Sequence, residues 1–145
     1  MDKILYYTTE VDWKEGKIGI LSSEGMKDIT IATPPEFPGG VPGIWSPEHL
    51  FVASANICLM TTFLAIAENS KLNFISYFSS GKGKVEKING RFLVTQIELM
   101  LQIRVKNEHD KERAMKIIEK SEKACLISSS MKSEILLKPE ITINN

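Results

Sequence analysis

Apolar and polar residues alternate in several short stretches of the chain, whereas one long stretch is apolar on every side. The alternation near the N-terminus predicts three strands, at residues 4–13, 16–21 and 28–33. The segment PPEFPGGVPG, residues 34–43, is too rich in Pro and Gly for regular structure and predicts a loop.

The long apolar stretch predicts a helix from Ser46 to Leu72. Ser46 suits the N-cap, Pro47 suits the first helical position, and Glu48 places a negative charge where the helix dipole favours one. Polar residues are sparse on every face after Leu50, so this helix is expected at the centre of the fold. One small domain cannot cover all of its faces, which favours a homodimer.

The rest of the chain predicts a hairpin, a second helix and a last strand. Strands at 74–87 and 91–106 flank the turn dipeptide Asn89-Gly90, an amphipathic helix follows at 107–125, and LISSSM is irregular before a strand at 134–143. This order of elements indicates an α+β fold, and the length of 145 residues indicates a single domain, residues 1–145.

Charge and cysteine content exclude several classes of protein. Lys and Arg balance Asp and Glu at 18 each, so no broad field attracts nucleic acid, and no nucleic-acid partner is expected. No secretory signal and no run of 18 apolar residues is present, so no membrane association is expected. Two cysteines are too few for a secreted disulfide scaffold, which favours a cytoplasmic location.

Cys58 and Cys125 are the residues most suited to chemistry. Taken alone, Cys58 fits inert packing in an apolar helix, because free cysteine is often buried. It lies several turns from the helix start, so a reactive thiolate there calls for a nearby cation. Cys125 lies at the C-terminal end of its helix, where the dipole disfavours a thiolate. If the two act together, Cys58 attacks and Cys125 resolves. His49 and His109 lack metal-ligand spacing, so no metal site is predicted.

Several short segments carry a resemblance to a known family. They are SSEG at 22–25, TP at 33–34, the Gly/Pro loop, SPEHLFVASANIC at 46–58, and KAC at 123–125. Over nearly its whole length the chain resembles the OsmC/Ohr superfamily, the osmotically inducible and organic hydroperoxide resistance proteins. The resemblance implies an OsmC-like α+β fold, with antiparallel sheets around a long central helix in an intertwined homodimer.

The resemblance also implies an activity and roles for residues. It implies a thiol-dependent peroxidase that reduces alkyl or fatty-acyl hydroperoxides in oxidative stress defence, with no cofactor and with a cellular dithiol as reductant. Cys58 would be the peroxidatic thiol, Cys125 the resolving thiol, and Glu48 the carboxylate that orients an active-site arginine. Ten helical residues rise about 15 Å, so Glu48 is expected to act across the dimer. Apolar neighbours on the helix, among them Leu59 and Phe63, favour an organic peroxide.

The chain departs from this pattern at two positions, which indicates a divergent member. No arginine precedes Arg91, so Lys14 is the first candidate for the activating cation and Lys17 the second, ahead of Arg91 and Arg104. The residue after the second cysteine, often proline in the family, is Leu126.

An alternative of another class is a non-catalytic dimeric module that binds an apolar small molecule and whose cysteines are structural. The two hypotheses differ in whether the cysteines lie within bridging range, with Cα atoms about 4.4–6.8 Å apart.

Overall fold

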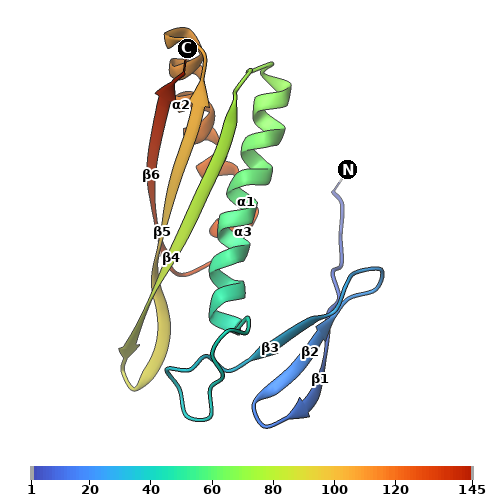
Figure 1. Ribbon diagram of the computed structural model, residues 1–145. Helices are drawn as coiled ribbons and strands as arrows, with labels where there is room; N and C mark the ends of the chain where they lie inside the picture. Colours follow the sequence, from blue (N-terminus) through green and yellow to red (C-terminus); the bar gives the residue numbers. More distant parts are fainter. Residues whose placement is uncertain (1, 145) are drawn as a thin grey trace. The chain divides into compact units, whose positions relative to one another are not determined.

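The computed structural model describes residues 2–144 and divides into two compact units, residues 1–50 and 51–145. Figure 1 shows the order of the elements along the chain. We refer to the two parts as the N-terminal unit and the C-terminal unit. Each contains its own three-stranded sheet, and the prediction of one domain over residues 1–145 stays a prediction.

The N-terminal unit is an antiparallel sheet in the order β1-β2-β3, formed by Glu10–Glu15, Ile18–Ser22 and Ile29–Ala32. The three predicted strands are therefore confirmed, but the first begins at Glu10 instead of residue 4. Glu10 pairs with Ser22, the last residue of β2, so residues 4–9 run past the end of their partner strand. Because no strand lies opposite residues 4–9, they do not pair into the sheet.

The Gly/Pro loop leads from β3 to the first helix and is fixed by backbone contacts. The amide of Ala32 donates to the carbonyl of Trp45 over 2.9 Å. Gly40 packs against the backbone of Pro34 so closely that a Cβ atom there would lie 1.9 Å from the Pro34 carbonyl oxygen. Glycine is therefore the only residue that fits this position without moving the loop.

Helix α1 (Pro47–Asn69) begins where the sequence predicts, because Ser46 caps it: its Oγ accepts from the backbone amide of His49 over 3.1 Å. The helix ends before the predicted Leu72. Lys71 adopts a left-handed backbone with φ of 55°, which no α-helix accommodates, and the amide of Leu72 turns back to the carbonyl of Ala67.

The C-terminal unit contains a mixed sheet in the order β4-β5-β6, formed by Ser76–Ile88, Arg91–Val105 and Glu134–Ile143. The predicted turn is confirmed, since Asn89 and Gly90 both have positive φ. Strand β6, however, pairs with β5 in parallel. The expectation of purely antiparallel sheets is therefore wrong for this strand.

The parallel pairing follows from the connection between the two strands. Helix α2 (Glu108–Ala124) and the short helix α3 (Leu126–Ser129) carry the chain back to the start of β5, and such a crossover brings the next strand in parallel. Helix α3 occupies part of the segment that was expected to be irregular.

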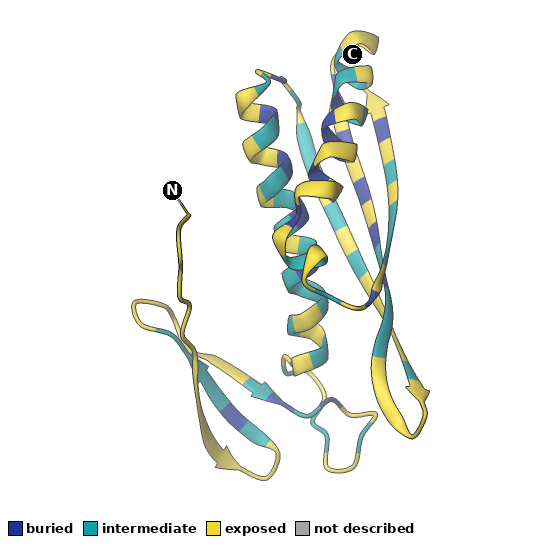
Figure 2. Ribbon diagram, turned by 180° about the vertical axis from the view of Figure 1, so that it is seen from behind, coloured by how far each residue is buried: buried dark blue, intermediate teal, exposed yellow. Residues whose placement is uncertain are grey.

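The core of the C-terminal unit lies between one face of its sheet and the two long helices. Helices α1 and α2 cover the same face (Figure 1), and buried residues alternate with exposed ones along β5 (Figure 2). The largest fully buried side chains include Phe63, Leu59, Ile97, Leu99, Leu101, Ile103 and Ile118.

Glycines bring α1 close to β4. A Cβ atom on Gly83 would lie 2.5 Å from Cγ2 of Val52, and one on Gly81 would lie 3.0 Å from Cγ1 of the same residue. The distance at Gly83 is shorter than real Cβ contacts and the one at Gly81 is at their tight end, so the absence of side chains at both glycines sets the spacing between helix and strand.

Helix α1 is long and apolar enough to cross a membrane by length and composition alone. The core helix of a soluble protein meets the same criterion, and Ala55, Leu59, Phe63 and Ala67 of α1 are buried in the core. Other residues of the helix, such as Ile57, are exposed. The expectation that no segment spans a membrane stays a prediction.

Candidate active site: a hydrogen-bonded cysteine pair

Cys58 and Cys125 are far apart in the sequence, and the C-terminal unit brings them close enough for each to act on the ionisation of the other. Cys58 lies near the middle of α1, and Cys125 stands between the last residue of α2 and the first of α3. Both are free cysteines, and the thiol of Cys125 hydrogen-bonds to the sulfur of Cys58. The structure therefore places together the two thiols that the sequence could only pair by resemblance.

Neighbouring hydrogen-bonding groups lower the pKa of Cys58. Partial burial by itself raises the pKa of this thiol, because it disfavours the charged form. Donors from the Cys125 thiol, the Ile127 amide, the Thr62 hydroxyl and the Leu126 amide outweigh that effect and lower the pKa of Cys58 below its ordinary value. The Thr62 Oγ1 atom lies 3.8 Å from the sulfur. The site thus stabilises the thiolate of Cys58.

The pKa of Cys125 is shifted in the opposite direction, upward. Only 1% of the residue is exposed, and burial raises the pKa of its thiol. The hydrogen bond to Cys58 raises the pKa further, since the proton of Cys125 is held between the two sulfurs. The Ser128 hydroxyl donates to Cys125 over 3.4 Å but does not offset these effects. Cys125 therefore remains a thiol at pH values where Cys58 is a thiolate.

Helix α1 is held in register beside the cysteine pair by a polar contact to β4. The Ser79 hydroxyl donates to Oδ1 of Asn56 over 2.7 Å, and Nδ2 of Asn56 donates back to the Ser79 carbonyl over 3.4 Å. Asn56 precedes Cys58 by two residues, so this reciprocal pair fixes the axial position of the helix at the reactive sulfur. Nearby, burial raises the pKa of Tyr77, and negative charge on Cys125 adds to that effect.

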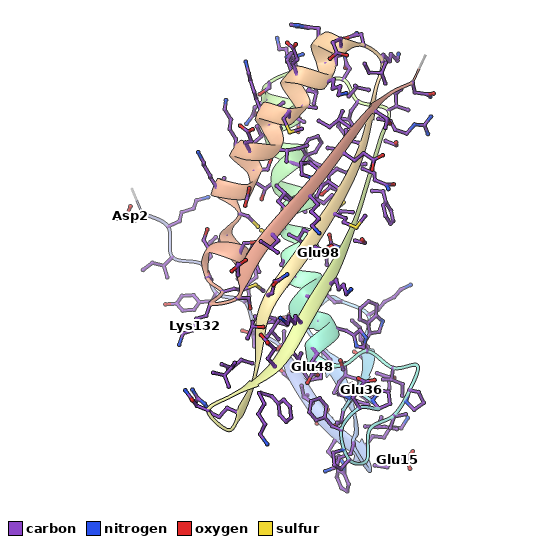
Figure 3. All side chains as sticks on the ribbon, turned by 90° about the vertical axis from the view of Figure 1, so that its left-hand side faces the viewer. Asp2, Glu15, Glu36, Glu48, Glu98 and Lys132 are labelled. Atoms are coloured by element: carbon purple, nitrogen blue, oxygen red, sulfur yellow. The ribbon has the colours of Figure 1, made fainter. Side chains whose placement is uncertain are left out.

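The other predicted site residues, Glu48 and Lys14, belong to the N-terminal unit. Glu48 lies in the first turn of α1 (Figure 3), and its Oε1 atom is buried without a hydrogen-bond partner among the described residues. Lys14 is exposed on β1. Across residues 2–144 no ion pair joins Lys14 to Glu48. The structure therefore does not bring these two residues together within their unit, and their roles stay predictions.

The donors that lower the pKa of Cys58 are neutral groups, where a cation was expected. Two of them are peptide amides of Leu126 and Ile127, and a peptide group gives no signal in residue type. Thr62 follows Cys58 by four residues, a spacing that places both side chains on one helix face. That spacing was the only signal in the sequence for a hydrogen-bond donor to Cys58. Among residues 2–144 no three His, Cys, Asp or Glu side chains are grouped to bind a metal ion.

The family model for OsmC-like proteins matches residues 40–140, a range that includes both cysteines. The chain belongs to the OsmC-like protein family. An OsmC-like protein of unknown function from Vibrio cholerae has a similar structure, with a TM-score of 0.84 and 21% sequence identity over 94% of this chain and 100% of that one. An organic hydroperoxide resistance protein from Elizabethkingia anophelis has a TM-score of 0.77 and 22% identity, with full coverage of both chains.

Among curated proteins, an uncharacterized protein of Methanocaldococcus jannaschii is 31% identical over 90 residues, which cover 62% of this chain. The aligned part spans about half of that relative, 46% of its length. The comparisons confirm the predicted family and the α+β fold with its long helix. The intertwined homodimer stays a prediction.

Proposed function

We propose that this OsmC-like protein is a thiol-dependent peroxidase that reduces organic hydroperoxides, with Cys58 as the peroxidatic and Cys125 as the resolving cysteine. The observation that supports this most strongly is the hydrogen bond between two free thiols whose pKa values move in opposite directions. A peroxidase of this kind needs one sulfur ionised to attack and a second kept in reserve to resolve. Structural relatives named as organic hydroperoxide resistance proteins support the same class of substrate.

The first chemical step is a nucleophilic displacement at oxygen. The Cys58 thiolate attacks the distal oxygen of ROOH, a sulfur–oxygen bond forms, and the oxygen–oxygen bond breaks. The departing alkoxide takes a proton from the Cys125 thiol and leaves as the alcohol ROH. Cys58 is then a sulfenic acid and Cys125 a thiolate.

The second step closes the disulfide. The Cys125 thiolate attacks the sulfur of the Cys58 sulfenic acid, a sulfur–sulfur bond forms, and hydroxide leaves and takes up a proton to become water. A cellular dithiol then reduces the disulfide, becomes oxidised itself, and returns both cysteines to the thiol state. No cofactor takes part in this cycle.

Exposed apolar residues next to both cysteines in the sequence favour an alkyl or fatty-acyl hydroperoxide over hydrogen peroxide. Ile57, which precedes Cys58, is 56% exposed, and Leu126, which follows Cys125, is 69% exposed. Leu59 and Phe63 were expected to contribute, but both are buried in the core and face away from solvent.

The proposal also gives roles to Glu48 and Lys14. A buried carboxylate oxygen without a partner is costly, and a cation supplied by a second copy of the chain would satisfy it. Lys14 is the first candidate for that cation.

The test of the proposed function is the consumption of cumene hydroperoxide in the presence of a dithiol, with the wild type compared with Cys58→Ser. We expect turnover by the wild type and its loss in the variant. The competing hypothesis, a module that binds an apolar ligand, is favoured by the exposed Ile57 and Leu126. It predicts that neither protein consumes peroxide and that both bind an apolar dye equally.

A further inference from the structure

A polar residue of α1 faces the sheet at a position where the helix otherwise presents apolar side chains. Asn56 lies on the same face of α1 as Val52, Leu59 and Phe63, which pack in or against the core. A Cβ atom on Gly81 of β4 would lie 3.5 Å from Cβ of Asn56, so the asparagine rests on the strand. Asparagine is a poorer helix former than alanine or leucine, so helix propensity does not explain its place there.

We propose that Asn56 is a positioning residue for the cysteine pair: its hydrogen bonds to β4 set the axial position and the rotation of α1, and thereby the distance between Cys58 and Cys125. The contribution of Asn56 to catalysis rests on the function proposed above. Its contribution to the geometry of the pair does not, and that contribution is measurable without peroxide.

The contact between Asn56 and β4 is directional, unlike the apolar packing around it. The Ser79 hydroxyl donates to Oδ1 of Asn56 over 2.7 Å, and Nδ2 of Asn56 donates to the Ser79 carbonyl over 3.4 Å. Shifting α1 by one residue moves it about 1.5 Å along its axis and turns it by about 100°, which carries the amide away from both partners. A single polar contact among apolar ones therefore selects one register of the helix.

Asn56 acts on the reactive sulfur through the helix. Two positions separate it from Cys58, so the two side chains lie roughly 200° apart around the helix axis and do not face each other. Asn56 is directed to the sheet, and Cys58 lies on the other side of α1. A rotation or slide of the helix on the sheet thus moves the sulfur.

Cys125 is held independently of Asn56. It is 1% exposed and stands between α2 and α3, where the Ser128 hydroxyl donates to its sulfur over 3.4 Å. One sulfur is therefore fixed in the core, whereas the other is carried on α1. The distance between them depends on how α1 lies on the sheet, and Asn56 sets that position.

The experiment measures the effective concentration of the two thiols toward each other, from their equilibrium with glutathione. Two exchange steps break the disulfide of oxidised glutathione, release two glutathione thiols and form the disulfide between Cys58 and Cys125. Peptide mass spectrometry of acid-quenched samples gives the oxidised fraction. We expect Asn56→Ala and Ser79→Ala each to lower the effective concentration about tenfold, because reactions within a molecule are sensitive to displacements of an ångström or less.

The double variant should fall little further than either single variant, because all three lack the same contact. Ser133→Ala is the matched control. The Ser133 hydroxyl donates to the carbonyl of Val94 on β5 over 2.6 Å, so this change removes a buried serine hydroxyl that is bonded to the sheet instead of to α1. It should lower the urea midpoint about as much as Ser79→Ala and leave the effective concentration at the wild-type value.

Two results would overturn the proposal. One is a wild-type effective concentration in both Asn56→Ala and Ser79→Ala. The other is an equal fall in Ser133→Ala, which would assign the effect to lost stability. Asn56→Ala also separates the two causes, because alanine strengthens the helix while it removes the contact. Ser79→Thr keeps the hydroxyl and should restore most of the wild-type value.

Consumption of cumene hydroperoxide is recorded on the same proteins. Effective concentrations that fall as expected, in a series whose wild type has no turnover, retain the positioning role and reject the peroxidase. Turnover by the wild type together with equal effective concentrations in all variants does the reverse.

Discussion

The thiol of Cys125 donates a hydrogen bond to the sulfur of Cys58, and this contact moves the pKa values of the two groups apart. When the pair loses one proton, the buried Cys125 stays protonated and the more exposed Cys58 carries the negative charge. The more exposed of the two thiols, Cys58, is therefore the one that ionises first.

The first prediction concerns that order. As pH is raised, iodoacetamide should label Cys58 before Cys125, because the pKa of Cys58 lies below its ordinary value and that of Cys125 lies above it. Between the two midpoints only Cys58 is a thiolate. Peptide mass spectrometry of samples quenched at successive pH values measures both. Equal labelling, or earlier labelling of Cys125, would show that the contact does not polarise the pair.

The second prediction is that an organic hydroperoxide converts the pair into an intramolecular disulfide. The two thiols are close enough for each to shift the pKa of the other, so a sulfenic acid on Cys58 would form with a thiol nearby. Non-reducing mass spectrometry should show a peptide joining Cys58 and Cys125 and the loss of two hydrogens. In Cys125→Ser the same treatment should drive Cys58 on to the sulfinic acid. A sulfinic acid at Cys58 in the wild type, with Cys125 still free, contradicts the resolving role.

The third prediction separates Lys14 from the amide donors. If Lys14 adds positive charge at Cys58, Lys14→Met should shift the alkylation profile of Cys58 to higher pH and slow peroxide reduction, while Lys14→Arg keeps both. Lys14 is exposed, so neither change is expected to alter the free energy of unfolding by more than about 0.5 kcal/mol. An unchanged profile in Lys14→Met assigns the whole effect to neutral donors and removes Lys14 from the site.

The fourth prediction tests the close approach of α1 and β4. Gly83→Ala introduces a Cβ atom 2.5 Å from Val52, and we expect the free energy of unfolding to fall by about 1–3 kcal/mol in urea titrations. Ser80→Ala on the same strand, at an exposed position, is the matched control and should change little. In Val52→Ala the clash has no target, so the double variant should lose less than the sum of the single variants. Additive losses would mean that the helix does not rest on Gly83.

The fifth prediction is a homodimer in solution. Phe51, Ile57 and Leu64 on α1 are exposed, as are Val11 and Trp13 on β1, and a soluble chain rarely leaves so many large apolar side chains uncovered. Analytical ultracentrifugation at micromolar concentration should give twice the chain mass of 16.3 kDa. Leu64→Lys places a charge in the apolar surface and should shift the population toward monomer. A well-folded wild-type monomer would contradict the prediction.

Features specified by neighbouring residues were predictable from the sequence. Ser46, Pro47 and Glu48 mark the start of α1, and Asn89-Gly90 marks the hairpin turn. Each of these residues acts on the backbone within a few positions of itself, so the local sequence is enough to predict its effect. The family resemblance supplied the pairing of the cysteines.

Features that depend on the path of the chain were not predictable. The parallel pairing of β6 with β5 depends on where α2 returns the chain, which no local pattern encodes. The effect of the Leu126 backbone on the pKa of Cys58 depends on how the turn after α2 meets α1, and a peptide group is one that every residue possesses. A search of the sequence for charged side chains therefore could not find this group.

Cys58 lies in α1, and Cys125 stands where α2 ends and α3 begins. A disulfide between them would therefore tie three helices of the C-terminal unit together. It would also close a long loop in the unfolded chain, and a cross-link of that kind lowers the entropy gained on unfolding. The oxidised protein should accordingly resist unfolding by urea more strongly than the reduced one.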